Sequence, residues 1–136
     1  MAFADAQSGG YVRHDATGVV AITLAGTASK GDILGYSSGW VRALATAGTA
    51  IQGICVALES GLITNVIPAA FGTCIVGGRI SGATAGNRIY VAEGTSNGMY
   101  TESVPSTSND CNTIIGISIA ATEILVMPNT LAKTVA

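Results

Sequence analysis

Short apolar runs alternate with small polar turns along almost the whole chain. The runs are rich in Val, Ile and Thr and are separated by Gly, Ser and Asn, as in β-strands joined by tight turns. Few windows repeat apolar residues at helical spacing, and frequent Gly and β-branched residues further disfavour helices. This pattern predicts an all-β fold with strands near residues 18–24, 32–36, 40–44, 51–58, 62–67, 73–80, 88–92, 99–102, 113–119 and 123–127.

The order of these elements occurs twice. Residues 20–34 (VAITLAGTASKGDIL) and 75–89 (IVGGRISGATAGNRI) each combine a strand, a small-residue turn, a Gly-Asp or Gly-Asn corner and a second strand. A hairpin strand and a Gly-Ile strand follow in both copies. The aligned glycine pairs are Gly31 with Gly86, Gly39 with Gly98, and Gly53 with Gly116.

These two copies predict a small β-barrel or β-tulip built from two similar β units. Two half-barrels related by a pseudo-twofold axis would bury the inward faces of both copies together. Chance similarity in a chain rich in Gly, Ala and Thr is the alternative, because few residues are identical between the copies.

Both ends of the chain lack strand periodicity. We therefore divide the chain into an extended N-terminal arm (residues 1–17), a β-barrel domain (18–128) and a C-terminal tail (129–136). The arm is either a frayed end or a segment that becomes ordered on a partner, and both interpretations stay open. Within the barrel domain, the polar stretch 103–112 (SVPSTSNDCN) predicts an exposed loop.

Charge is scarce in this sequence. Only 10% of the residues are charged, against about 25% in an average soluble domain, which suits a surface packed against another protein. The net charge is −2 and the basic residues are scattered, which disfavours nucleic-acid binding. No apolar run approaches the ~20 residues of a transmembrane helix, and the first ten residues do not resemble a signal peptide. We expect synthesis in the cytoplasm and no membrane or nucleic-acid partner.

The sequence offers little catalytic chemistry. His14 is the single histidine, so any Ser-His or Cys-His pair would depend on a residue of the arm. Residues 26–32 (GTASKGD) differ from a phosphate loop, because the Lys precedes the Gly and Asp32 would repel phosphate. We interpret this stretch as a turn in which Asp32, like Asn87 in the second copy, caps backbone groups.

The cysteines do not form a recognisable site either. Their wide spacing provides neither a disulfide framework nor a metal-binding pair, and we expect at least the first two to be buried thiols. They are Cys55, Cys74 and Cys111. We therefore expect no enzyme activity, no cofactor and no metal.

Candidate partner-binding residues lie in the arm and at the first hairpin. Trp is enriched at the centres of interfaces, although packing on the core is an alternative for Trp40. Arg79 and Arg88 interrupt apolar runs beside the second corner and either face solvent or reach a partner's carboxylate. The candidate partner-binding residues are Tyr11, Arg13, His14, Asp15 and Trp40.

Three stretches of the chain together resemble a known family. They are KGDILGYSSGWVRALATAGTAIQGICVA (30–57), GRISGATAGNRIYVAEGTSNGMYTE (78–102) and NTIIGISIAATEILVMP (112–128). In these features the chain resembles the capsid decoration (cement) proteins of tailed bacteriophages. The shared elements are a Gly-Asp strand, a Gly-led hairpin strand and a closing strand that ends in an apolar-Pro pair, here Met127-Pro128. The resemblance covers about residues 18–128.

The resemblance implies a β-tulip-like barrel on the outside of an icosahedral phage head. Such a protein bridges neighbouring subunits of the major capsid protein, commonly as a homotrimer, with a dimer as another possibility. The resemblance assigns no capsid-contact residue, because the N-terminal segment does not match. The alternative is a receptor- or carbohydrate-binding β domain of a phage tail fibre or bacterial surface protein, a class that usually has more than the 5% aromatic residues found here.

Overall fold

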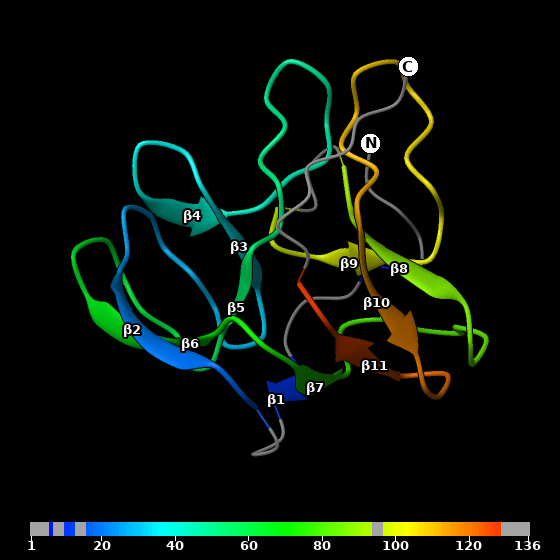
Figure 1. Ribbon diagram of the computed structural model, residues 1–136, viewed down its shortest axis with the longest axis horizontal. Coiled ribbons are helices and arrows are strands. Elements are labelled where there is room, and N and C mark those ends of the chain that lie inside the picture. Colours follow the sequence, from blue (N-terminus) through cyan, green and yellow to red (C-terminus); the bar gives the residue numbers. More distant parts are fainter. Residues whose placement is uncertain (1–5, 7–9, 13–15, 94–96, 129–136) are drawn as a thin grey trace.

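The computed structural model describes residues 6, 10–12, 16–93 and 97–128. These residues form eleven strands in two antiparallel sheets that lie side by side (Figure 1). The first sheet contains β2 (Val19–Thr23), β3 (Ile33–Tyr36), β4 (Trp40–Arg42), β5 (Cys55–Ala57) and β6 (Val66–Ala70). The second contains β1 (Tyr11–Val12), β7 (Cys74–Gly77), β8 (Arg88–Val91), β9 (Tyr100–Thr101), β10 (Ile114–Ser118) and β11 (Glu123–Val126).

The predicted all-β, barrel-like fold is confirmed. Ten of the eleven strands overlap the predicted ranges, and β1 is the addition. The largest shift is in β6, which continues through Pro68 to Ala70 instead of ending near residue 67. A proline fits there because it still offers its carbonyl, which accepts a hydrogen bond from the N–H of Leu58 at 3.0 Å.

The two sheets repeat one topology. We call β2–β6 the first unit (residues 19–70) and β7–β11 the second unit (residues 74–126). The first sheet has the order β2-β6-β5-β3-β4 and the second has the order β7-β11-β10-β8-β9, with β1 added outside β7. Each strand of one unit therefore has a counterpart at the same place in the other, as expected for the duplicated unit.

Equivalent hydrogen bonds fix the alignment of the two corners. The N–H of Gly31 donates to the carbonyl of Ala57 at 2.7 Å, and the N–H of Gly86 donates to the carbonyl of Ser118 at 2.7 Å. Both glycines have φ near +90°, a conformation that costs other residues strain. The alignment of Gly31 with Gly86 is correct.

The other two glycine alignments are displaced. Leu34 and Ile89 are equivalent, because each lies three residues after its corner glycine. Leu34 pairs with Cys55 and Ile89 pairs with Gly116, so Gly116 matches Cys55 and not Gly53. The register irregularity of β10 between Ile114 and Gly116 lies beside this position. In the first hairpin Trp40 pairs with Tyr36, and at the equivalent place in the second hairpin Tyr100 pairs with Val91. Gly39 therefore matches Met99 and not Gly98.

The first sheet curls around a core of its own. Leu24, just after β2, forms a parallel bridge with Trp40, and the N–H of Ala25 donates to the Trp40 carbonyl at 2.9 Å. Trp40 and Phe71 are partly buried and pack against this enclosed core. Its buried members are Ile22, Leu24, Ala28, Leu34, Cys55, Ala57, Ile67 and Ala69.

A second, larger core joins the two units. The opposite face of the first sheet contributes Ile33, Val56 and Ala70, which pack with residues of the second sheet such as Val76 and Ile124. By the strand registers, the counterparts of these three residues are Arg88, Ile117 and Leu125, which lie on the outer, partly or fully exposed face of the second sheet. The two units thus bury opposite faces against each other, and the expected burial of both inward faces about a pseudo-twofold axis is wrong.

Part of the predicted N-terminal arm belongs to the second sheet. In β1, Tyr11 pairs with Gly77 and Val12 with Val76, and farther along the N–H of Thr17 donates to the Thr73 carbonyl at 2.8 Å. A two-residue strand has no periodicity of its own, so its pairing depends on the exposed edge of β7. Binding of a partner by the arm stays a prediction.

Two long loops, between β4 and β5 and between β9 and β10, project from the same side of the molecule (Figure 1). The second includes the predicted loop 103–112, which is mostly exposed. Its buried members are Pro105, Asp110 and Cys111, and the N–H of Cys111 donates to the carbonyl of Ala45 at 2.8 Å. The two loops therefore support each other.

Candidate functional site

The predicted partner-binding residues are not all placed. Arg13, His14 and Asp15 lie outside the described residues. Tyr11 lies in β1 and is 47% exposed, and its hydroxyl donates to Oε2 of Glu123 at 2.6 Å. The ring of Tyr11 covers Gly77, where a Cβ atom would collide with it. Tyr11 thus holds β1 on the second sheet while part of its surface remains accessible.

Trp40 closes the core of the first unit. Its ring packs edge-to-face with Tyr36 at 5.2 Å and with Phe71 at 5.4 Å between centroids. Trp40 is partly buried, whereas Tyr36 is 60% exposed. The outer surface of this aromatic cluster is therefore formed mainly by Tyr36, which sequence reasoning did not single out.

A buried ion pair connects the two units. Asp32 and Arg79 are almost fully buried, and Nη2 of Arg79 donates to Oδ1 of Asp32 at 2.6 Å. Nε of Arg42, which is more exposed, donates to Oδ2 of the same carboxylate at 2.6 Å. Oδ2 also accepts the N–H of Ser29 at 2.8 Å, which confirms Asp32 as a capping residue of its turn.

Arg79 reaches across the junction from the second unit. Its Nη1 donates to the carbonyl of Lys30 at 3.2 Å, and its Nη2 donates to that of Gly98 at 3.2 Å. Its guanidinium lies 5.9 Å from the ring centroid of Tyr100, whose hydroxyl donates to the carbonyl of Gly31 at 2.7 Å. Burial raises the pKa of Tyr100 well above its usual range, so its hydroxyl stays a hydrogen-bond donor.

The sequence left open whether Arg79 and Arg88 face solvent or a carboxylate, and the two behave differently. Arg79 pairs with a carboxylate of its own chain, whereas Arg88 is exposed and donates to the carbonyl of Gly86 at 3.2 Å. Both arginines stand out in the sequence because each interrupts an apolar run. The difference between them comes from a tertiary contact, since only Arg79 reaches Asp32, 47 residues away.

Two carboxyl groups meet beside the long loops. A hydrogen bond with Asp110 is the main cause that raises the pKa of Glu93, and burial adds to it. Burial opposes ionisation of Asp110, but hydrogen bonds from Glu93 and from the N–H groups of Ala47 and Thr107 outweigh it and lower the pKa of Asp110. Asp110 thus acts as the anion that orders both loops.

The three cysteines are free and buried, as the sequence indicated for the first two. Burial raises the pKa of Cys55 to about 12, so its thiol is neutral and unreactive near neutral pH. The Sγ of Cys111 hydrogen-bonds Oε1 of Gln52 at 2.8 Å. Within the described ranges, no group of three or more His, Cys, Asp or Glu side chains is arranged to hold a metal ion.

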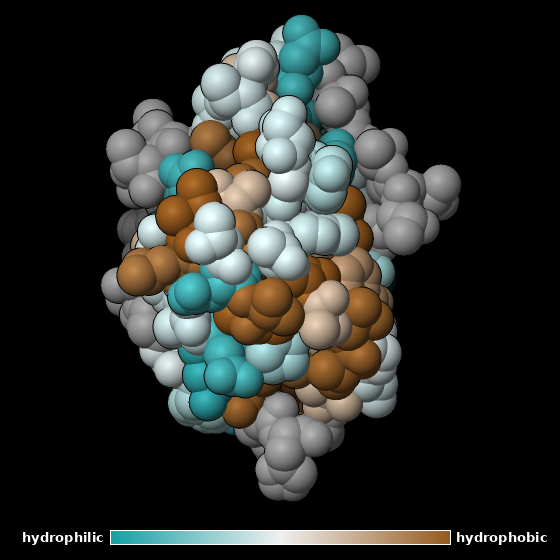
Figure 2. All heavy atoms as spheres, turned by 90° about the vertical axis from the view of Figure 1, so that its left-hand side faces the viewer, coloured by the Kyte–Doolittle hydropathy of each residue, from teal (hydrophilic) through white to brown (hydrophobic). Residues whose placement is uncertain are grey.

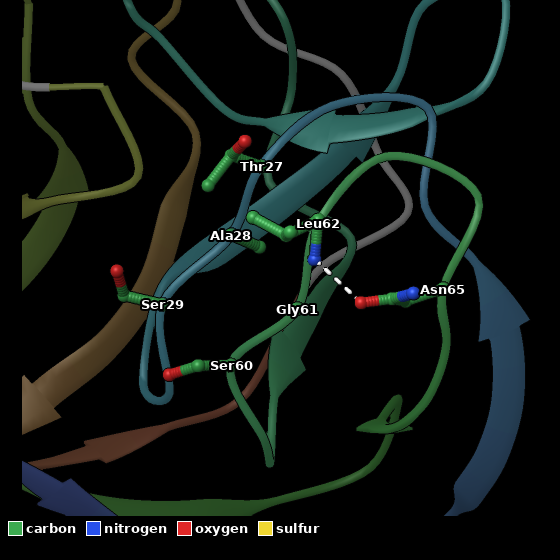
Figure 3. Close-up of a pocket in the computed structure, with 7 residues that line it drawn as sticks. All are labelled: Thr27, Ala28, Ser29, Ser60, Gly61, Leu62 and Asn65. Carbon is green, nitrogen blue, oxygen red and sulfur yellow. Dashed lines mark hydrogen bonds between the residues drawn. The ribbon is translucent and has the colours of Figure 1, made fainter.

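A pocket of about 410 Å³ lies between the turn before β3 and the loop before β6. Its lining residues offer hydroxyl, amide and backbone groups, and the N–H of Leu62 donates to Oδ1 of Asn65 at 2.8 Å (Figure 3). No charged or aromatic side chain lines it, so the pocket itself provides neither a general base nor a stacking platform. The lining residues are Thr27, Ala28, Ser29, Ser60, Gly61, Leu62 and Asn65.

Six of the eleven large hydrophobic side chains that are exposed among the described residues lie on the first unit. Figure 2, which faces the left-hand side of Figure 1, shows hydrophobic surface interrupted by polar residues. The exposed fractions of the large members lie between 52% and 66%, which is unusual for Val, Leu and Ile. We call this set the β2–β6 patch: Val19, Val20, Leu62, Ile63 and Val66.

Comparisons with protein-family models, with curated proteins and with solved structures gave no match for this chain. Among the described residues, no helix is long and apolar enough to cross a membrane.

Proposed function

We propose that this chain is a structural protein of a tailed-phage head: a decoration protein that binds the outer capsid surface. There it bridges subunits of the major capsid protein and stabilises the shell against internal pressure. The observation that carries the proposal is the β2–β6 patch, an exposed apolar surface on a firmly joined pair of β units. A rigid block with such a surface suits repeated docking on a shell, where many weak contacts add up to strong attachment.

The internal chemistry of the described residues supports a mechanical role. The buried side chains of Asp32 and Arg79 form an ion pair with each other, and the buried hydroxyl of Tyr100 donates a hydrogen bond to a backbone carbonyl. These groups hold the two units together and are closed to substrates. We therefore propose that the protein is not an enzyme and works without a cofactor.

The direct test is binding to isolated heads. The capsid protein is identified from genes next to the one that encodes this chain, and expanded heads lacking the chain are mixed with the purified full-length protein. We expect co-sedimentation with the heads and an increased temperature of head disruption. Val66→Lys, which places a charge in the patch, is expected to weaken attachment at least about tenfold.

Ala50→Lys is the matched control, because it adds the same charge at an exposed loop position outside the patch. Failure of the unaltered protein to co-sediment would contradict the proposal. Binding to glycans or to host cells instead of heads would favour the receptor- or carbohydrate-binding alternative. The pocket lined by hydroxyl and amide groups would then be the first place to look.

A further inference from the structure

The connection between β5 and β6 differs from its counterpart in the second unit. It comprises residues 58–65, whereas β10 and β11 are joined by residues 119–122 alone. The longer connection contains a turn in which the N–H of Asn65 donates to the carbonyl of Leu62 at 3.0 Å. We call residues 62–65 the apolar turn, because the side chains of Leu62 and Ile63 are 63% and 60% exposed.

The segment that follows β2 holds the backbone of the apolar turn at two places. The N–H of Thr64 donates to the carbonyl of Leu24 at 2.8 Å, and the N–H of Leu24 donates to the carbonyl of Asn65 at 2.9 Å. Just before the turn, Gly61 and Ala28 exchange two hydrogen bonds, at 2.9 and 3.0 Å. The apolar turn is therefore fixed to the body of the first unit although its two apolar side chains are exposed.

The apolar turn also contains a strained residue. Thr64 has a φ of +73°, a left-handed conformation that β-branched residues rarely adopt and that turns of this kind usually give to glycine. Within the turn, the N–H of Leu62 donates to Oδ1 of Asn65 at 2.8 Å (Figure 3). A strained conformation persists only where the surrounding contacts determine it, so the apolar turn has one shape before any partner binds.

The surroundings of the apolar turn are polar and uncharged. Leu62 also lines the pocket of about 410 Å³, whose other lining side chains include hydroxyl and amide groups (Figure 3). An apolar centre with a polar rim is the composition of protein–protein interfaces. Turns and helices that insert into a lipid surface usually have basic and aromatic neighbours, and residues 59–66 contain neither. The polar side chains of this rim are Thr27, Ser29, Ser60 and Asn65.

We propose that the apolar turn is the main contact through which the β2–β6 patch binds its protein partner. Leu62 and Ile63 enter an apolar depression on the partner, and uncharged polar groups around that depression bond to the hydroxyl and amide groups of the rim. This inference rests on the proposed function, in which the partner is the major capsid protein. Apolar side chains that are already held in place contribute strongly to an interface, because little conformational freedom is lost on binding.

The test measures the dissociation constant of full-length variants for expanded heads by co-sedimentation. Leu62→Asn combined with Ile63→Asn is expected to raise the dissociation constant at least about tenfold. Both side chains are exposed, so the urea midpoint of unfolding should not change. Ile119→Asn is the matched control, because it makes the same kind of change in the equivalent connection of the second unit, and it should leave head binding unchanged.

A second variant tests whether the fixed shape of the turn matters. Asn65→Ala removes the acceptor for the N–H of Leu62 but keeps both apolar side chains, and is expected to weaken head binding by about two- to tenfold. Asn65→Asp supplies a carboxylate oxygen at the same place and is expected to restore binding. Equal binding by Asn65→Ala and the unaltered protein would show that the shape of the turn is not used.

The outcomes separate this inference from the proposed function. If the unaltered protein binds heads and the Leu62 and Ile63 double variant binds them equally well, the apolar turn is not the main contact, and the proposed function stands. If the unaltered protein does not bind heads, the proposed function is wrong and this inference is wrong with it. Flotation with vesicles of phosphatidylcholine and phosphatidylglycerol that the double variant loses would overturn the protein partner in favour of a lipid surface.

Discussion

The two Gly corners show how one backbone serves two purposes. At the first corner, Asp32 is buried and holds two arginines, one of them from the other unit. At the second, Asn87 is exposed, and its Nδ2 donates to Oε2 of Glu102 at 3.0 Å. Glu102 occupies the place of Arg42 in the equivalent hairpin. The first corner has become the joint between the units, and the second remains a surface turn.

The outer edges of the two sheets differ in a similar way. The edge of β7 is covered by β1, in which Tyr11 pairs with Gly77 and Val12 with Val76. The edge of its counterpart β2 meets β4 of the same unit at its C-terminal end, through the parallel bridge between Leu24 and Trp40. The first sheet therefore curls back on itself, whereas the second sheet is extended by a strand from the N-terminal segment.

The largest effect is expected from breaking the joint at the first corner. Arg79→Met leaves Asp32 buried without its main partner, and we expect the free energy of unfolding to fall by about 3–5 kcal/mol. Arg88→Met, in the exposed arginine beside the second corner, is expected to change it by less than about 0.5 kcal/mol. Urea denaturation followed by the fluorescence of Trp40 measures both.

A double substitution separates charge from packing in the same joint. Arg79→Met combined with Asp32→Leu leaves no uncompensated buried carboxylate, so part of the lost stability should return. The recovery is incomplete because Asp32 also binds Arg42 and caps Ser29. Equal losses in the two single arginine variants would show that the joint is not confined to the first corner.

An intermediate effect is expected from the corner glycines. Gly31 and Gly86 have φ values of +89° and +93°, so alanine at either position should cost about 1–2 kcal/mol in backbone strain. A Cβ at Gly31 would lie 3.1 Å from Nη1 of Arg79, whereas a Cβ at Gly86 would meet nothing within 4 Å. Gly31→Ala should therefore cost more, and a larger cost at Gly86 in thermal denaturation would contradict the proposed difference between the corners.

The smallest effect is expected from the carboxyl pair, which only the second unit has. Because the pKa of Glu93 is raised on folding, its contribution to stability is present below its ordinary value of 4.5 and is lost as the pH rises through the folded value. Asp110 behaves oppositely, since its lowered pKa makes its contribution disappear as the pH falls below 3.8. Glu93→Gln should remove the loss of stability above pH 4.5, as measured by urea midpoints, whereas an unchanged pH profile would exclude this pair.

Local patterns in the sequence predicted most strands, because short Val- and Ile-rich runs between Gly turns determine where strands can form. They also predicted the Gly31 and Gly86 corners, whose φ values favour glycine. The two-residue strand β1 was not predicted, because its pairing is determined by the edge of β7 and not by its own sequence pattern. The Gly53 alignment failed because β10 has an irregular register that small-residue composition does not reveal.

The candidate site was less predictable because it depends on contacts distant in sequence. Asp32 was recognised as a capping residue, but its pairing with Arg79 spans 47 residues and joins two units whose mutual orientation was unknown. The β2–β6 patch arises because the curled first sheet turns Val19 and Val66 outward while Ile22 and Ile67 fill its core. Strand periodicity alone does not say which face of a small curled sheet is covered.

The central claim is that the first corner is the joint between the two units and the second is a surface turn, and residue-resolved amide hydrogen exchange tests it most directly. The amides of Gly31 and Gly86 make equivalent hydrogen bonds, to the carbonyls of Ala57 and Ser118, but Gly31 is buried and Gly86 is exposed. The account predicts that the Gly31 amide exchanges much more slowly than the Gly86 amide, and that Arg79→Met reduces this difference. Equal protection of the two amides in the unaltered protein would contradict the account.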